Sequence, residues 1–302
     1  MGEKSWDKII IGRHEQRVNT DTISSDRPQK GDEEHPDYPG ITESGVEHGT
    51  ETTKQELLDI VNRADPDAIV FFGGSSEEIR TKSTNKLRGD ILAKEFGKRD
   101  DVVVYTQEDM EKLRQEAKDG NGKVLNLVED IIESNKDKKI IFTYPLFLKG
   151  LSLRPQFRES GTGKRIYYSK KLGDLSHDHP DKSVEVWLKD EGKLHDGEET
   201  IQGKKTPQQV AEEHMRDIQR LRNFTKRFSG DRQSIIGLTG HGWNEDALMV
   251  YLANRGKVDA EGFSELGSVA IKQGELSQIE FSDGEIIFHY RGQKYNIPED
   301  KI

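Results

Sequence analysis

Runs of consecutive apolar residues, each closed by glycine or by polar residues, recur along the chain. Runs of this length predict buried strands over 9–11, 68–72, 102–105, 139–144 and 234–238. Helical spacing of apolar residues and helix-start signals predict helices over 51–63, 76–96, 107–118, 123–134, 206–228 and 245–254. Alternation of apolar and polar residues predicts further strands near 268–272, 277–281 and 285–295. Strands alternating with helices predict an α/β fold, a three-layer α/β/α sandwich with a mostly parallel central sheet.

Two long stretches interrupt this alternation. Residues 18–50 are polar and contain three prolines, which predicts a long loop. From 145 to 205 the chain is rich in Gly, Lys, Asp and His, with short β-like pieces at 165–168 and 184–188. We interpret this second stretch as a cap-like insertion within one domain that spans 1–302, and not as an independent second domain.

The composition excludes several classes of protein. The chain has no cysteine, which excludes disulfides, thiolate metal sites and a cysteine nucleophile. No apolar stretch approaches the roughly 18–20 residues that span a bilayer, and Met1–Lys8 lacks the apolar core of a signal peptide, so we expect a soluble, cytoplasmic protein. A net charge of −10 disfavours binding to nucleic acid or to an anionic membrane. An anionic ligand therefore requires a local cluster of cations.

Polar clusters follow three of the predicted strands. They are Gly12–Arg17, Ser75–Thr81 and Gly240–Gly242, and in an open α/β sheet such strand ends form the active site. The clusters bring two histidines and three arginines to one edge of the sheet. Arginine binds phosphate oxygens in pairs, and neutral imidazole can attack phosphorus to form a covalent intermediate. Neighbouring guanidinium groups disfavour imidazolium and so keep the attacking nitrogen unprotonated.

The order of these motifs resembles that of the histidine phosphatase superfamily, which includes the cofactor-dependent phosphoglycerate mutases. Ile10–His14 resembles its Arg-His-Gly signature, and Ile41–Gly45 resembles the Leu-Thr-Glu-x-Gly segment that follows. Phe72–Thr84 resembles the Ser-x-x-x-x-Arg-x-x-x-Thr stretch, and Leu238–Leu248 resembles the strand and helix around the second histidine. The tail, Glu265–Ile297, resembles the final strands of the family.

The resemblance implies a role for each matching residue. His14 is implied to be the nucleophile that becomes phosphohistidine. Arg13 and Arg80 are implied to bind phosphate oxygens, with His241 as a second catalytic histidine in contact with the phosphate. Arg17 matches a second arginine that the acid-phosphatase branch places three residues after its histidine.

The resemblance also implies a proton donor. In the family this is usually an acid beyond the helix that follows the Arg80 position, which favours Glu108, with Asp109 and Glu111 as alternatives. The acid-phosphatase branch instead uses an Asp directly after its second histidine, where this chain has Gly242. The mutase-like arrangement is therefore favoured, with Glu108 protonating the leaving oxygen and then activating water.

Two positions depart from the family pattern. Glu15 stands where glycine is usual, and a carboxylate there repels phosphate unless it points away or pairs with Arg17. Asn19 replaces a proline of the acid-phosphatase motif. We expect a phosphatase that hydrolyses a small-molecule phosphomonoester without metal or cofactor. The alternatives are a phosphoglycerate-mutase-like phosphotransferase and a non-catalytic phosphate-binding module.

Three other motifs carry weaker signals. His177-Asp178-His179 offers metal-ligand side chains, but no third ligand stands at a telling spacing, so we interpret it as a solvated loop. Gly161–Arg165 lacks the spacing of a phosphate-binding loop. The basic run Lys164–Lys171 is interpreted as an exposed strand, with contact to a distal part of the substrate as the alternative.

Overall fold

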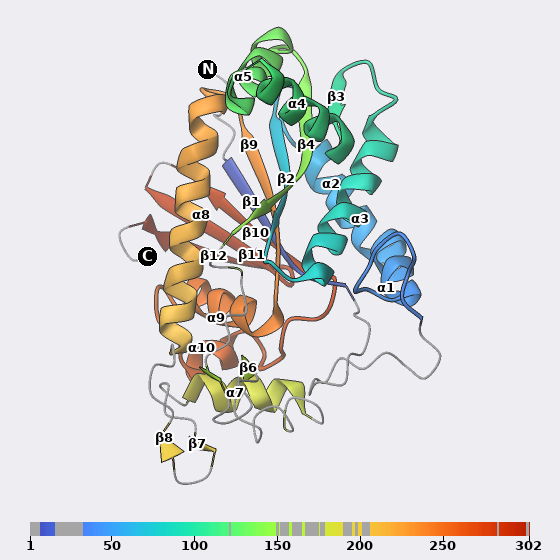
Figure 1. Cartoon of the computed structure of the whole chain (residues 1–302). Coiled ribbons are helices and arrows are strands. Elements are labelled where there is room, and N and C mark those ends of the chain that lie inside the picture. The colour runs from blue at the N-terminus through green and yellow to red at the C-terminus, as the bar shows by residue number, and fades with distance from the viewer. Residues whose placement is uncertain are drawn as a thin grey trace.

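The computed structural model describes thirteen stretches of the chain: 7–15, 33–120, 122–148, 151, 157–158, 165–166, 175, 179–189, 195–196, 199–200, 206–282, 284–299 and 302. Its centre is a twisted sheet with helices on both sides (Figure 1). Among the described helices, none combines the length and the apolar character needed to cross a bilayer.

The central sheet has eight strands, of which five are parallel to their neighbours. In spatial order they are β12 (Gln293–Pro298), β11 (Glu285–Tyr290), β10 (Leu276–Phe281), β1 (Asp7–Arg13), β9 (Ser234–Gly240), β2 (Ile69–Ser75), β4 (Lys139–Phe147) and β3 (Val102–Tyr105). The strands from β1 to β3 pair in parallel, while β10, β11 and β12 continue the sheet antiparallel. The predicted α/β fold with a mostly parallel core is confirmed.

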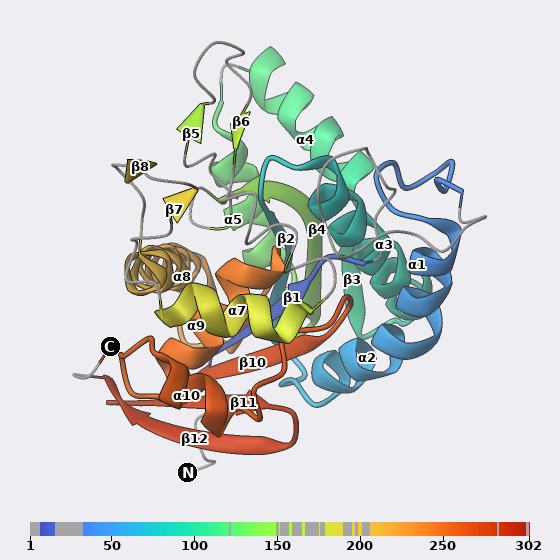
Figure 2. The same cartoon turned by 90° about the horizontal axis from the view of Figure 1, so that it is seen from below.

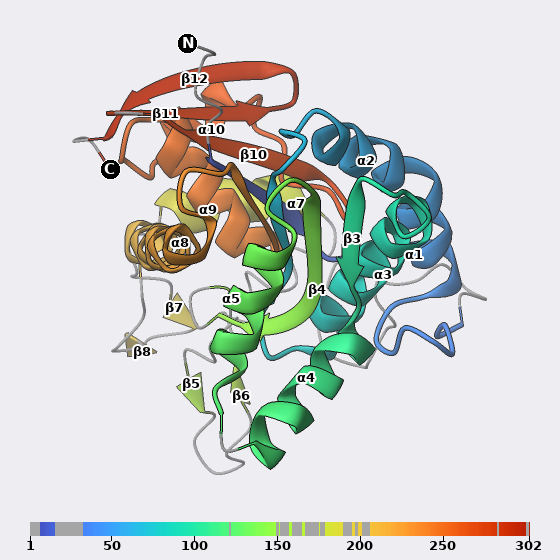
Figure 3. The ribbon, with the colours of Figure 1, turned by 90° about the horizontal axis from the view of Figure 1, so that it is seen from above.

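Helices cover both faces of this sheet, as the view from above shows (Figure 3). One face carries α1 (Glu43–His48), the short π-helix η1 (Gly49–Thr53), α2 (Lys54–Asn62) and α3 (Ile79–Phe96). The other carries α4 (Gln107–Asp119), α5 (Val124–Ser134), α8 (Pro207–Ser229), α9 (Gly242–Ala253) and α10 (Ala260–Glu265). Three layers result, as predicted.

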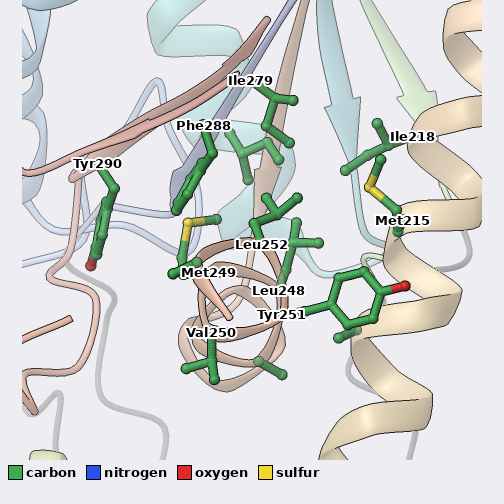
Figure 4. Packing of buried hydrophobic residues seen from close by; sticks show 14 of the residues in the cluster. Met215, Ile218, Leu248, Met249, Val250, Tyr251, Leu252, Ile279, Phe288 and Tyr290 are labelled. Atoms are coloured by element: carbon green, nitrogen blue, oxygen red, sulfur yellow. The ribbon is translucent and has the colours of Figure 1, made fainter. Parts of the chain in front are cut away.

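Helix α9 is buried along its whole length. Leu248, Met249 and Leu252 pack between the sheet and α8 (Figure 4), and a helix that is apolar on all sides is stable only inside a core. Helix α8, which lies outside it, begins where it was predicted, and the structure shows a Thr206 N-cap, a capping box and Pro207 in its first turn. This packing fixes the start of α9, directly after His241.

Some predicted elements are wrong. Residues 184–188 were expected as a β-like piece but belong to helix α7 (Pro180–Lys189). Its buried residues are Ser183, Val184, Trp187 and Leu188. This spacing places them on one helical face, so packing overrides the local alternation. Residues 268–272 form a loop and not a strand.

Two further boundaries differ from the prediction. The expected loop over 18–50 contains helix α1, which starts where the Thr42 side chain accepts from the backbone N–H of Gly45. The expected strand over 285–295 is two strands, because Arg291 and Gly292 have φ of 49° and 74° and turn the chain.

Helix α7 is the longest described element of the expected insertion. It packs against α9 and α10, beside the strand ends, as the view from below shows (Figure 2). Two small two-stranded sheets also fall in this stretch, β5 (Phe157–Arg158) with β6 (Arg165–Ile166), and β7 (His195–Asp196) with β8 (Glu199–Thr200). The expected strand at 165–168 is thus present over its first two residues, and the one-domain organisation stays a prediction.

Candidate active site

The three predicted polar clusters meet at one edge of the sheet. Strands β1, β9 and β2 are parallel neighbours, so their carboxyl ends lie side by side (Figure 1). Arg13 pairs with Gly240 in the register of β1 and β9. The backbone N–H of His14 donates to the Gly240 carbonyl at 3.3 Å. For the described residues of the three clusters (12–15, 75–81 and 240–242), the predicted convergence is confirmed.

His14 has a defined tautomer. Its ring is buried, with 3% of its surface exposed, and its Nδ1 lies 2.7 Å from the backbone carbonyl oxygen of Glu15. A carbonyl oxygen only accepts, so Nδ1 carries the hydrogen and donates it. In the neutral ring Nε2 then holds the lone pair, which is the state that a nucleophile at phosphorus requires.

His241 lies opposite His14, with the ring centroids 5.5 Å apart and the planes inclined by 66°. Arg80 Nη2 lies 3.3 Å from its Nδ1. Since a guanidinium group only donates, Nδ1 accepts, and Nε2–H of the neutral ring donates to Ser76 Oγ at 2.9 Å. His241 therefore contacts two residues of the second cluster, including the predicted phosphate ligand Arg80.

Ser76 connects the start of α3 to His241 through hydrogen bonds. Its buried hydroxyl lies 2.8 Å from Thr81 Oγ1 and accepts from the backbone N–H of Glu78 at 3.2 Å. Having accepted from His241, it donates to Thr81, which donates on to the Glu78 carbonyl at 2.8 Å. This chain of hydrogen bonds holds the Arg80 backbone beside the two imidazoles.

The Arg13 side chain extends from the end of β1 toward the start of α9. Its Nη1 donates to the Ile271 carbonyl at 2.7 Å. The guanidinium lies against Gly242, where an added Cβ would come within 3.1 Å of Arg13 Cζ. Glycine at the first position of α9 thus leaves room for the arginine, and the predicted phosphate ligand stands one residue from His14.

Arg88 is a positioning residue that the sequence prediction missed. It lies on α3 with 1% of its surface exposed, where Nη1 donates to Thr239 Oγ1 at 2.8 Å and Nη2 to the Arg13 carbonyl at 3.1 Å. An added Cβ at Gly12 would approach its terminal nitrogens to 2.8–2.9 Å. Arg88 therefore ties the end of β1 to the end of β9 from beneath the site.

Glu15 points away from the two histidines. Its buried carboxylate lies 3.0 Å from His48 Nδ1 and accepts from Thr53 Oγ1 at 3.2 Å. The hydrogen bond to this carboxylate raises the pKa of His48, against the opposing effects of burial and of Arg88. The expected repulsion of phosphate is thereby relieved in the first of the two predicted ways, since the Glu15 carboxylate points away and contacts His48 on α1.

Two buried carboxyl groups at the start of α9 were also missed. Glu245 is fully buried, and its Oε1 accepts from the backbone N–H of Gly240 at 2.8 Å. Asp246 accepts from the backbone N–H of Ile271 at 2.7 Å. Burial raises the pKa of Glu245 to about 8 and that of Asp246 to about 7, although Arg13 acts in the opposite direction on both. Their negative charges are thus disfavoured beneath the candidate site.

The raised pKa of Glu245 predicts a pH dependence of stability. The folded chain keeps its proton between pH 4.5 and about 8, while the unfolded chain releases it near 4.5. The stabilisation is therefore complete below pH 4.5 and is lost as the pH rises to 8. As the pH rises from 5 to 8, we expect the free energy of unfolding of Glu245→Gln to increase by roughly 2–4 kcal/mol relative to that of the wild type. Urea unfolding measures both.

The matched control for this prediction is Glu261→Gln, which changes an exposed carboxylate on α10. Its pH dependence should equal that of the wild type. Equal slopes for Glu245→Gln and the wild type would contradict the prediction.

The predicted proton donor lies at the far side of the parallel strands. Glu108 follows the edge strand β3, and β4, β2 and β9 lie between β3 and β1, a backbone separation of roughly 19 Å at about 4.8 Å per strand. Its side chain is 80% exposed and pairs with Lys112 at 2.8 Å. Its role stays a prediction.

The two alternative donors are engaged in other contacts. Asp109 caps α4, where it accepts from the backbone and the hydroxyl of Thr106. These bonds lower the pKa of Asp109, so near neutral pH this carboxyl group rarely holds a proton that it could donate. Glu111 pairs with Arg114 at 3.3 Å.

Several predicted positions lie outside the described residues. Among them are Arg17, Asn19, His177 and Asp178, as well as the four residues 161–164. The predictions made for these positions stand as they were.

Comparison with known proteins gives matches among solved structures alone. No family model matches the chain, and no curated protein matches its sequence significantly. A mycobacterial glucosyl-3-phosphoglycerate phosphatase is 12% identical, with a TM-score of 0.41 over 90% of this chain and 89% of that chain. Its complex with VO3 is 14% identical, with a TM-score of 0.40 over 90% and 92%. A structure named mycobacterial hydrolase 2 is 12% identical, with a TM-score of 0.42 over 98% and 90%.

Proposed function

We propose that this chain is a phosphatase of the histidine phosphatase type, which hydrolyses small-molecule phosphomonoesters through phosphohistidine at His14 and needs no metal. The observation that carries the proposal is the hydrogen bond from His14 Nδ1 to the Glu15 carbonyl. It leaves the lone pair on Nε2, in a ring that lies opposite His241 and next to Arg13.

The reaction has two displacement steps. In the first, His14 Nε2 forms a bond to phosphorus while the bond from phosphorus to the ester oxygen breaks, and the leaving oxygen takes a proton from an acid. In the second, the conjugate base takes a proton from water, the water oxygen attacks phosphorus and the N–P bond breaks. Inorganic phosphate leaves, and His14 returns to its starting state.

Two arginines on different elements would stabilise the charge on the phosphoryl oxygens. Arg80 lies at the start of α3, in contact with His241, and Arg13 lies at the end of β1, directly before His14. Each guanidinium offers several N–H donors in a fixed plane, which suits a tetrahedral oxyanion. His241 shares its Nδ1 with Arg80 and so orients this arginine.

The contacts of Glu15 are compatible with both phosphate binding and catalysis. A carboxylate aimed at the phosphate would oppose both binding and attack. Here it lies against His48 and Thr53, so the phosphoryl group would meet the backbone of Glu15 and not its charge.

The experiment that tests the proposal follows turnover of p-nitrophenyl phosphate in the presence of EDTA. We expect hydrolysis that vanadate inhibits, because vanadate adopts the five-coordinate geometry of the transition state. Rapid quenching should trap phosphate on the protein as an acid-labile, alkali-stable phosphohistidine at His14. No hydrolysis, or hydrolysis that EDTA abolishes, would contradict the proposal.

The role of Glu108 as proton donor is tested by comparing an alkyl phosphate with p-nitrophenyl phosphate. An acid matters most for a poor leaving group, so Glu108→Gln should reduce kcat on an alkyl phosphate by about a hundred-fold and on p-nitrophenyl phosphate by much less. Glu116→Gln, a change at an exposed carboxylate on the same helix, serves as the control. Equal kcat values for Glu108→Gln and the wild type on both substrates would exclude Glu108 as the donor.

A further inference from the structure

The loop over 267–275, which joins α10 to β10, runs along the end of β1. The backbone N–H of Arg13 donates to the Glu275 carbonyl at 3.2 Å, and that of Gly274 donates to the His14 carbonyl at 3.4 Å. The loop is therefore attached to both residues of the Arg-His pair.

Side chains of two helices hold adjacent amides of this loop. Asp181 of α7 accepts from the backbone N–H of Ala270 at 2.8 Å. Asp246 of α9 accepts from the backbone N–H of Ile271 at 2.7 Å. One carboxylate comes from the expected insertion, and the other comes from the helix that follows His241.

The carbonyl groups of the same residues are held by arginines. Arg291 donates from Nη1 to the Val269 carbonyl and from Nη2 to the Ala270 carbonyl, each at 2.9 Å. Arg13 Nη1 donates to the Ile271 carbonyl at 2.7 Å. Four side chains from α7, α9, β1 and the turn before β12 thus fix one short stretch of backbone.

This arrangement makes the position of Arg13 depend on the insertion. The Ile271 carbonyl orients the guanidinium, and the peptide that bears it is held through Ala270 by Asp181. Helix α7 itself is anchored against α9, where Trp187 stacks on Trp243 with the ring centroids 5.4 Å apart. A shift of α7 would therefore reach Arg13 along the short backbone stretch from the Ala270 N–H to the Ile271 carbonyl, without any contact between α7 and the phosphate.

We propose that Asp181 is a positioning residue, which couples the insertion to the phosphate site by orienting Arg13 through the 267–275 loop. The inference rests on the proposed function, since it takes Arg13 to be a phosphate ligand. It gives the insertion a role in phosphate binding in addition to any contact with the rest of the substrate.

The test compares Asp181→Ala with Asp181→Asn, because asparagine keeps an acceptor oxygen at the same place. In Asp181→Ala we expect the KM for p-nitrophenyl phosphate and the Kd for inorganic phosphate to rise about five-fold, the effect of one lost hydrogen bond. The kcat should change less than KM, and Asp181→Asn should restore both KM and Kd. Glu185→Ala, on the same helix and paired with Lys189, should leave both unchanged.

Two results would overturn the inference. One is a phosphate Kd for Asp181→Ala equal to that of the wild type, and the other is an equal loss in Asp181→Asn and Asp181→Ala. Because calorimetry of phosphate binding needs no turnover, this comparison decides the coupling even for a protein that fails to hydrolyse any ester. A melting temperature lowered in Asp181→Ala without a change in Kd would assign Asp181 a structural role alone and overturn the coupling.

Discussion

Replacing His14 with alanine should lower kcat on p-nitrophenyl phosphate by at least about a thousand-fold, because the attacking atom is lost and water must attack the ester directly. Binding of inorganic phosphate should weaken far less, since Arg13 and Arg80 remain. The measurement is turnover in EDTA together with calorimetry of phosphate binding. A loss confined to kcat would assign His14 to the chemical step.

The matched control is His289→Ala, which removes an imidazole from β11 that pairs with Glu280 at the outer part of the sheet. Its kcat should stay within about two-fold of the wild type. Because the His14 ring is buried, the melting temperature of His14→Ala is also measured, to show that this variant still folds. Turnover in His14→Ala within ten-fold of the wild type, in EDTA, would rule out the phosphohistidine mechanism.

The meeting of the three clusters could be predicted from the sequence because each lies directly after a buried apolar run. In a parallel sheet such runs end at the same edge, and β1, β9 and β2 are indeed neighbours. The order in which the strands lie side by side in the sheet is harder to predict from the sequence. β3 and β4 were predicted correctly, yet nothing in the local pattern says that β3 is the edge strand, so the distance of Glu108 from β1 could not be foreseen.

The buried charges could not be predicted for a related reason. Arg88 stands in a helix rich in charged residues, and only packing distinguishes it from the exposed ones. Room for its guanidinium depends on Gly12, two residues before His14. Glu245 and Asp246 resemble ordinary acids of a first helical turn, and they are buried because α8 and α7 cover α9. The signal that could have found them is their place within an otherwise apolar helix.

Helix α7 illustrates the limit of local alternation. The sequence Val184–Leu188 alternates enough to suggest a strand, but the buried residues of α7 follow helical spacing once α9 and α10 provide an apolar surface. The same packing brings Asp181 to the 267–275 loop. The contact between Asp181 and the 267–275 loop therefore comes from α7, the element whose secondary structure was predicted wrongly.

Replacing Arg88 with methionine should lower the free energy of unfolding by about 3–5 kcal/mol, because it removes a buried cation from among groups that depend on it. Glu15 and Glu245 are the carboxyl groups that interact most strongly with this charge, and methionine fills the space without replacing it. The Thr239 hydroxyl and the Arg13 carbonyl also lose their donor. Urea unfolding at pH 7 measures the effect.

Arg114→Met is the matched control, because this arginine is half exposed and pairs with Glu111 at the surface of α4; its stability should change by less than about 0.5 kcal/mol. Arg88→Lys keeps the charge but cannot span both acceptors, so it should fold and yet lose activity. The activity would be lost because the Arg13 carbonyl, in the peptide bond that joins Arg13 to His14, would no longer be held in place by Arg88. Wild-type stability in Arg88→Met would mean that the buried charge is not needed there, and full activity in Arg88→Lys would mean that the tie between β1 and β9 does not position the nucleophile.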